Sequence, residues 1–153
     1  MIAHGHSRNT FDIDLIIRRG DLKDWVELLT SRGYTLINEG VTFSQFNPAD
    51  DKMLPVDLMT VNDETFSKLF ADAVPGPAQI EHVKLVSLLH LLALKCHAIK
   101  HGHSGRIIKD TDDVIRLIQI NRLDVKRADL REIFQKFGTE ELYEKVKKAC
   151  ASD

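Results

Sequence analysis

Two aspartates lie two residues apart inside an apolar run near the start of this sequence, FDIDLII at positions 11–17. The run is short and rich in Ile and Phe, which predicts a β-strand. Side chains alternate along a strand, so Asp12 and Asp14 project from one face, with Cα atoms about 6.6 Å apart. Two ionised carboxylates on one face repel each other, which predicts a cation between them.

A third acid, Asp57, lies in a second apolar run, LPVDLMTV at positions 54–61, which also predicts a strand. If the two strands pair side by side, this acid faces Asp12 and Asp14 across the ladder. Divalent cations such as Mg²⁺ and Mn²⁺ prefer oxygen ligands, and a metal clamp for phosphoryl chemistry needs several carboxylates. The three acids are therefore candidate metal ligands. The plainer alternative for Asp57 is a strand edge or a solvent-facing position.

Periodicity, capping residues and turn signals predict an α+β fold, in the order β-α-β-β-β-α followed by a helical half. Asp21, Asp63 and Thr139 are expected to begin helices as N-caps, and Gly33 to end one. The expected strands are 11–17, 34–37, 42–46 and 54–61, and the expected helices are 22–32, 63–71, 87–100, 107–120, 128–137 and 140–149.

The run VPGPA at 74–78 contains two of the four prolines and predicts an internal boundary. We expect an α/β core over 1–76 and a mainly helical part over 77–153, packed on the core as one structural unit. A length of 153 residues suits one domain or a core with a small appendage.

Charge and cysteine usage exclude several classes of protein. The formal net charge is −2, which provides no overall electrostatic attraction to nucleic acid or to an anionic membrane. Cys96 and Cys150 have no CxxC partner and are expected to be reduced thiols. The N-terminus has no apolar signal-peptide segment, and the longest apolar run, 85–94, is too short to span a bilayer. We expect a cytoplasmic protein with no membrane partner.

The acids belong to longer motifs. GHSRNTFDIDL at 5–15 is followed by GY at 33–34 and VDL at 56–58. The first resembles the pattern G-x-x-R-x-T-x-D-[IL]-D-[LI] of the nucleotidyltransferase superfamily, whose fold is shared with DNA polymerase β. The other two fall where that family places a helix end and its third acid. The resemblance implies a nucleotidyltransferase-like mixed β-sheet with flanking helices.

A second motif lies in the helical half, where LALK at 92–95 is followed by Arg106, Lys109, Asp110 and Asp113. It resembles the L-x-L-K…R-x-x-K-D-x-x-D segment of small bacterial members of the superfamily. These members include the AbiEii-type abortive-infection toxins and related uncharacterised proteins. Together the motifs extend the resemblance from about residue 3 to about residue 118.

The resemblance implies transfer of a nucleoside monophosphate from a nucleoside triphosphate to an acceptor, with pyrophosphate leaving. Asp12, Asp14 and Asp57 would be the catalytic acids and would bind Mg²⁺ or Mn²⁺, and Asp57 is also a candidate general base. RNA ends, a protein hydroxyl and a small molecule are all compatible acceptors.

The resemblance also implies residues that bind the nucleotide or its phosphates. Arg suits a bidentate phosphate contact, which favours Arg8 in the loop before the first strand; the alternative is a surface salt bridge. The plainer alternative for Lys95 is a lysine that snorkels at a helix surface. For Lys109 the alternative is an i,i+4 ion pair with Asp113 at the helix surface. The candidates are Ser7, Arg8, Thr10, Lys95 and Lys109, with Arg106, Asp110 and Asp113 in supporting roles.

One part of the family pattern is missing. The family has a Gly-Gly or Gly-Ser pair about ten residues before the first acid, because only small residues let the backbone approach the triphosphate. Gly5 lies too near Asp12 to serve, so the sequence resembles an N-terminally truncated member. Either translation starts farther upstream, or the protein is a catalytically degenerate binding module. Such a module could be one component of a toxin–antitoxin-like system. In the second case a homodimer or a partner chain would cover the N-terminal sheet edge.

Seven histidines are many for this length. His97 and His101 are spaced i,i+4 on one expected helix face, a spacing that can bind a transition metal, and His103 follows. No cysteine or acid at zinc spacing accompanies them, and Gly102 interrupts the helix. The sequence therefore favours surface histidines here.

Overall fold

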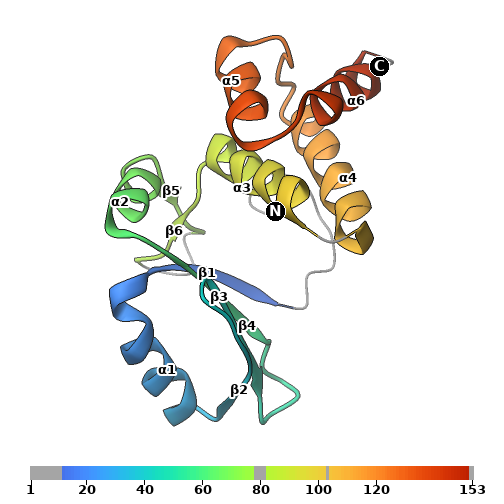
Figure 1. Ribbon diagram of the computed structural model, residues 1–153. Coiled ribbons are helices and arrows are strands. Elements are labelled where there is room, and N and C mark those ends of the chain that lie inside the picture. The colour runs from blue at the N-terminus through green and yellow to red at the C-terminus, as the bar shows by residue number, and fades with distance from the viewer. Residues whose placement is uncertain (1–11, 78–81, 103, 152–153) are drawn as a thin grey trace. The chain divides into compact units, whose positions relative to one another are not determined.

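The computed structural model describes residues 12–77, 82–102 and 104–151, apart from the side chains of residues 104–106. It confirms the α+β class, with strands and helices in the described residues as drawn in Figure 1. The chain divides into two compact units, one ending at Ala71 and the other beginning at Asp72. Each unit has its own hydrophobic core.

The first unit, called the sheet unit, contains a four-stranded mixed sheet in the order β1-β4-β3-β2. β4 pairs parallel with β1 and antiparallel with β3, while β2 and β3 form an antiparallel hairpin. The predicted side-by-side pairing of the first and fourth strands is therefore confirmed. The elements are β1 (Ile13–Arg18), η2 (Arg19–Asp21), α1 (Leu22–Ser31), β2 (Tyr34–Glu39), β3 (Phe43–Pro48), β4 (Val56–Val61) and α2 (Asp63–Ala71).

The core of the sheet unit lies between one face of this sheet and α1 (Figure 1). Ile17, Phe46 and Leu58 are buried on that face, and α1 contributes Leu29 and Trp25. Because side chains alternate along a strand, the residues between these positions belong to the opposite face. The opposite face is the one that carries the predicted acids of β1 and β4.

Helix ends in the sheet unit follow local rules, with one correction. Gly33 has a φ of +85° and ends α1 in the left-handed conformation, as predicted. The N-cap position at Asp21 is as predicted, because α1 begins at Leu22, whereas the N-cap predicted at Asp63 is wrong. Asp21 is the last residue of a 3₁₀ turn, has helical dihedral angles and makes no capping bond with its side chain. At α2 the cap lies one residue earlier, because Asn62 Oδ1 accepts from the Thr65 N–H at 2.8 Å.

The second unit, called the helical unit, packs its helices around a separate core. Side-chain caps mark the starts of two of its helices. Ser87 Oγ accepts from the His90 N–H at 3.4 Å, and Thr139 Oγ1 accepts from the Leu142 N–H at 3.2 Å. The second of these was predicted. Fully buried members of the core include Leu92, Val114, Leu117, Leu130, Phe134 and Val146. The elements are β5 (Val74–Pro75), β6 (Lys84–Leu85), α3 (Leu88–His101), α4 (Ser104–Ile120), α5 (Ala128–Phe137) and α6 (Glu140–Cys150).

The short β5–β6 ladder was not predicted. Val74 pairs with Leu85 and Pro75 with Lys84, in antiparallel orientation. Strands of two residues are too short for a periodic hydrophobic pattern, so the sequence shows only the prolines of a turn. Among the described residues, no helix has both the length and the apolar character that crossing a bilayer requires.

Candidate active site

Two of the predicted acids lie side by side on the sheet. β1 and β4 are parallel neighbours, and Asp14 and Asp57 are register partners. Neighbouring strands are about 4.8 Å apart, and side chains in register share a face. Asp14 is exposed and Asp57 is half-buried. Two carboxylates from distant parts of the sequence are thus within reach of one ligand.

The third predicted acid is less closely associated with this pair. Asp12 lies one residue before β1 and is exposed. In the described part of the chain, no three His, Cys, Asp or Glu side chains converge to hold a metal ion. Carboxylate oxygens suit Mg²⁺ or Mn²⁺, but Asp12, Asp14 and Asp57 do not form a three-ligand group here. The sheet by itself assembles the Asp14–Asp57 pair.

A row of side-chain amides continues from Asp57 across the sheet. Gln45 is the β3 partner of Asp57, and its Nε2 donates to Asp57 Oδ1 at 3.3 Å. Asn38 is the β2 partner of Gln45, and its Nδ2 donates to Gln45 Oε1 at 3.3 Å. An ionised carboxylate can only accept hydrogen bonds, so donation runs from Asn38 through Gln45 to Asp57. We call Asn38 and Gln45 the amide row. Together they hold one carboxylate oxygen of Asp57 in place.

Sequence reasoning missed the amide row. Gln45 lies in FSQFN, where polar and apolar residues alternate, and this alternation places Gln45 on the polar face of a strand. Nothing in that pattern identifies its neighbour, because strand register depends on pairing across the sheet. The register with β4 is what places the amide beside Asp57.

Replacing Gln45 with Met should destabilise the sheet unit by about 1 kcal/mol, because Asp57 loses a hydrogen bond at a half-buried site. Gln45→Glu should cost more, since like charges directly opposite on neighbouring strands repel each other. Urea unfolding followed by the fluorescence of Trp25, the single tryptophan and a residue packed on this core, measures both changes. Wild-type stability in both variants would show that the amide row does not hold Asp57.

Lys95, Asp110 and Asp113 form a buried ion cluster where α3 packs against α4. Lys95 Nζ lies 2.6 Å from Asp110 Oδ1 and 2.8 Å from Asp113 Oδ2. The two Asp side chains are 3% and 2% exposed, and that of Lys95 is 15% exposed. We call these three residues the ion cluster. They lie together because buried carboxylates need an opposite charge and hydrogen-bond donors.

The ion cluster rules out two of the plainer interpretations. A snorkelling Lys95 is wrong, because its ammonium group contacts the two buried carboxylates of Asp110 and Asp113. A surface pair of Lys109 with Asp113 is also wrong, because Asp113 is buried whereas Lys109 is exposed. Helix spacing puts Lys109 and Asp113 on one face, and the structure adds a contact to Asp113 from Lys95 on α3.

Phosphate binding by the residues predicted to contact the nucleotide stays a prediction. The ammonium group of Lys95 contacts two carboxylates, so it would have to exchange partners to reach a phosphate. Lys109 is exposed on α4. Ser7, Arg8 and Thr10 lie outside the described residues, as does the side chain of Arg106.

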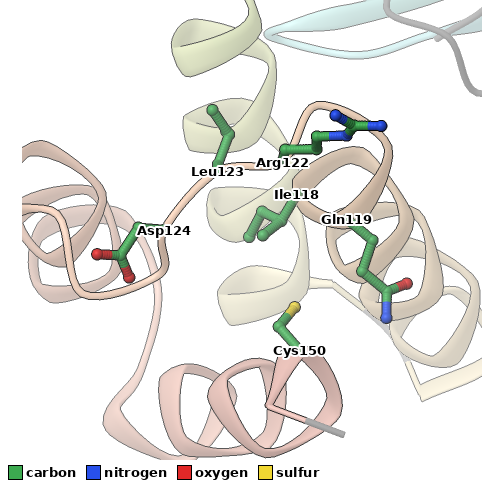
Figure 2. Close-up of a pocket in the computed structure, with 6 residues that line it drawn as sticks. All are labelled: Ile118, Gln119, Arg122, Leu123, Asp124 and Cys150. Carbon is green, nitrogen blue, oxygen red and sulfur yellow. The ribbon is translucent and has the colours of Figure 1, made fainter. Parts of the chain in front are cut away.

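A pocket of about 320 Å³ lies in the helical unit, where the end of α4 approaches the end of α6 (Figure 2). In Figure 2 the side chains of Ile118 and Cys150 face each other, and the guanidinium of Arg122 points away from them. The lining residues are Ile118, Gln119, Arg122, Leu123, Asp124 and Cys150. None of them is a predicted site residue, so the pocket is not part of the predicted active site.

Neither Cys96 nor Cys150 is joined in a disulfide among the described residues. Burial in the helical core raises the pKa of Cys96 to about 12. A thiol that stays protonated at neutral pH is a poor nucleophile. Cys96 is therefore a core residue and not a candidate for covalent catalysis.

No protein-family model matches the chain, and no curated protein sequence matches it. The resemblance to the nucleotidyltransferase superfamily therefore rests on the motifs of the sequence.

Proposed function

We propose that the chain is a metal-dependent nucleotidyltransferase that moves a nucleoside monophosphate from a nucleoside triphosphate to an acceptor. The observation that supports this most directly is the pairing of Asp14 with Asp57 on parallel neighbouring strands. Carboxylates that approach from two strands can share a divalent cation, as phosphoryl-transfer sites do. Asp12, next to β1, is the proposed third acid.

In the proposed reaction, an acceptor hydroxyl oxygen forms a bond to the α-phosphorus while the bond to the β-phosphate breaks and pyrophosphate leaves. Asp57 is the proposed general base for the hydroxyl proton, and Gln45 orients it through one carboxylate oxygen. Asp12, Asp14 and Asp57 are the proposed Mg²⁺ or Mn²⁺ ligands. When bound, the ion would neutralise charge on the triphosphate.

The nucleoside triphosphate is the proposed first substrate, and the acceptor is an RNA end, a protein hydroxyl or a small molecule. Ser7, Arg8 and Thr10 are the proposed phosphate contacts, because they precede the strand that carries the acids. We place the reaction in the cytoplasm, where cysteines remain reduced, since neither Cys96 nor Cys150 has a CxxC partner.

The proposal predicts a thermal shift that requires both metal and nucleotide. At about 100 times the dissociation constant a ligand adds about 2.7 kcal/mol, which should raise the melting temperature by about 5 to 10 °C. Wild-type protein is melted with MgCl₂ alone, with each nucleoside triphosphate alone, and with both. Asp14→Asn should lose the combined shift, whereas Asp24→Asn, an exposed acid on α1, should keep it. A folded chain without any shift, or an equal shift in Asp14→Asn, would contradict the proposal.

The second candidate is a catalytically degenerate binding module, for which one component of a toxin–antitoxin-like system is the proposed setting. The observation that favours it is that the three predicted acids do not converge as metal ligands in the described residues. This candidate predicts no combined metal and nucleotide shift, together with assembly into a homodimer or onto a partner chain. Size-exclusion chromatography with light scattering of the purified chain tests for the homodimer.

A further inference from the structure

Two imidazole rings lie against each other at the end of α3. The ring centroids of His97 and His101 are 4.5 Å apart, with 49° between the ring planes. Both side chains are exposed. Positions i and i+4 are neighbours on one face of a helix, which brings the two rings together.

We propose that His97 and His101 form a two-ligand site for a borderline transition-metal cation such as Zn²⁺, Ni²⁺ or Cu²⁺, with water completing its coordination. Imidazole nitrogen suits these ions, whereas Mg²⁺ and Ca²⁺ prefer oxygen. Paired histidines one turn apart on a helix are an established way to hold zinc. The site thus differs in ligand chemistry from the carboxylate pair of the sheet unit.

Partial burial and nearby positive charges favour the neutral, metal-binding form of His97. Partial burial of the ring, together with the positive charges of His101 and Lys100, lowers the pKa of His97 below its usual value. A neutral imidazole has the free lone pair that a metal requires. Lys100 also repels a bound cation, which opposes binding.

The end of the helix partly offsets that repulsion. α3 ends at His101, with Gly102 as its C-cap. The last carbonyl groups of a helix have no partners within it and carry partial negative charge, which favours a cation near the final turn. A metal that links residues of this turn would also hold the turn in its helical conformation.

The test titrates the full chain with NiCl₂ or ZnCl₂ at neutral pH by calorimetry and follows the histidine ring resonances by NMR. His97→Gln and His101→Gln should each weaken binding by about tenfold or more, because the site loses one of two linked ligands. His82→Gln removes another exposed histidine and is the matched control. MgCl₂ should not bind to the pair, and mildly acidic pH should weaken Ni²⁺ binding, since protons compete for the rings.

Several outcomes would overturn this inference. They are no Ni²⁺ or Zn²⁺ binding by the wild-type chain, full affinity in both variants, and ring shifts confined to other histidines. Far-UV circular dichroism shows whether the variants keep their helices, so that a lost site is distinguished from a lost fold. The readout does not involve nucleotide transfer, so neither result bears on the proposed function.

Discussion

Replacing Lys95 with Met is expected to lower the free energy of unfolding of the helical unit by about 3 to 5 kcal/mol. The substitution removes the ammonium group that lies 2.6 Å from Asp110 and 2.8 Å from Asp113. Both carboxylates are almost fully buried, and a buried charge that loses its partner is costly. Met has an unbranched chain like that of Lys, so packing between α3 and α4 should change little.

Lys109→Met is the matched control, because it makes the same change at an exposed position of α4 and should alter stability by less than about 0.5 kcal/mol. Urea unfolding followed by far-UV circular dichroism compares the two. Adding Asp110→Asn and Asp113→Asn to Lys95→Met should restore part of the loss, since a buried amide costs less than a buried charge. Equal stability of Lys95→Met and Lys109→Met would mean that the ion cluster does not stabilise the fold.

Replacing Asp14 or Asp57 with Asn is expected to reduce nucleotide transfer by at least about 100-fold, because each change removes a negative charge that the proposed chemistry needs. Asn keeps the shape of Asp, and in Asp57→Asn the new amide oxygen could still accept from Gln45. The fold should therefore survive, with an unfolding midpoint near that of the wild type. Asp12→Asn should have a similar effect on transfer.

The measurement is incorporation of label from α-labelled nucleoside triphosphates into RNA, protein or small-molecule acceptors, with pyrophosphate release as a second readout. Asp24→Asn again controls for loss of an acid outside the site. Full transfer in all three site variants would refute the assignment of the acids. Loss of transfer together with loss of the Trp25 unfolding transition would instead indicate damage to the sheet unit.

Local patterns in the sequence determined much of the secondary structure. The apolar runs FDIDLII and LPVDLMTV predict β1 and β4, and side-chain alternation puts Asp12 and Asp14 on one face of the first strand. Gly33 ends α1 because glycine adopts a positive φ without strain, and Thr139 caps α6 because its hydroxyl reaches the next turn. These features depend on neighbouring residues only, so the sequence is sufficient to predict them.

The tertiary structure alone decided which distant residues lie together. Strand register pairs Asp14 with Asp57 and extends the row through Gln45, which no local pattern identifies. Helix packing brings the ammonium group of Lys95 on α3 to Asp113 on α4, which helix periodicity alone does not identify. Periodicity specifies a face of a strand or helix, whereas the partner on that face depends on how the elements pack.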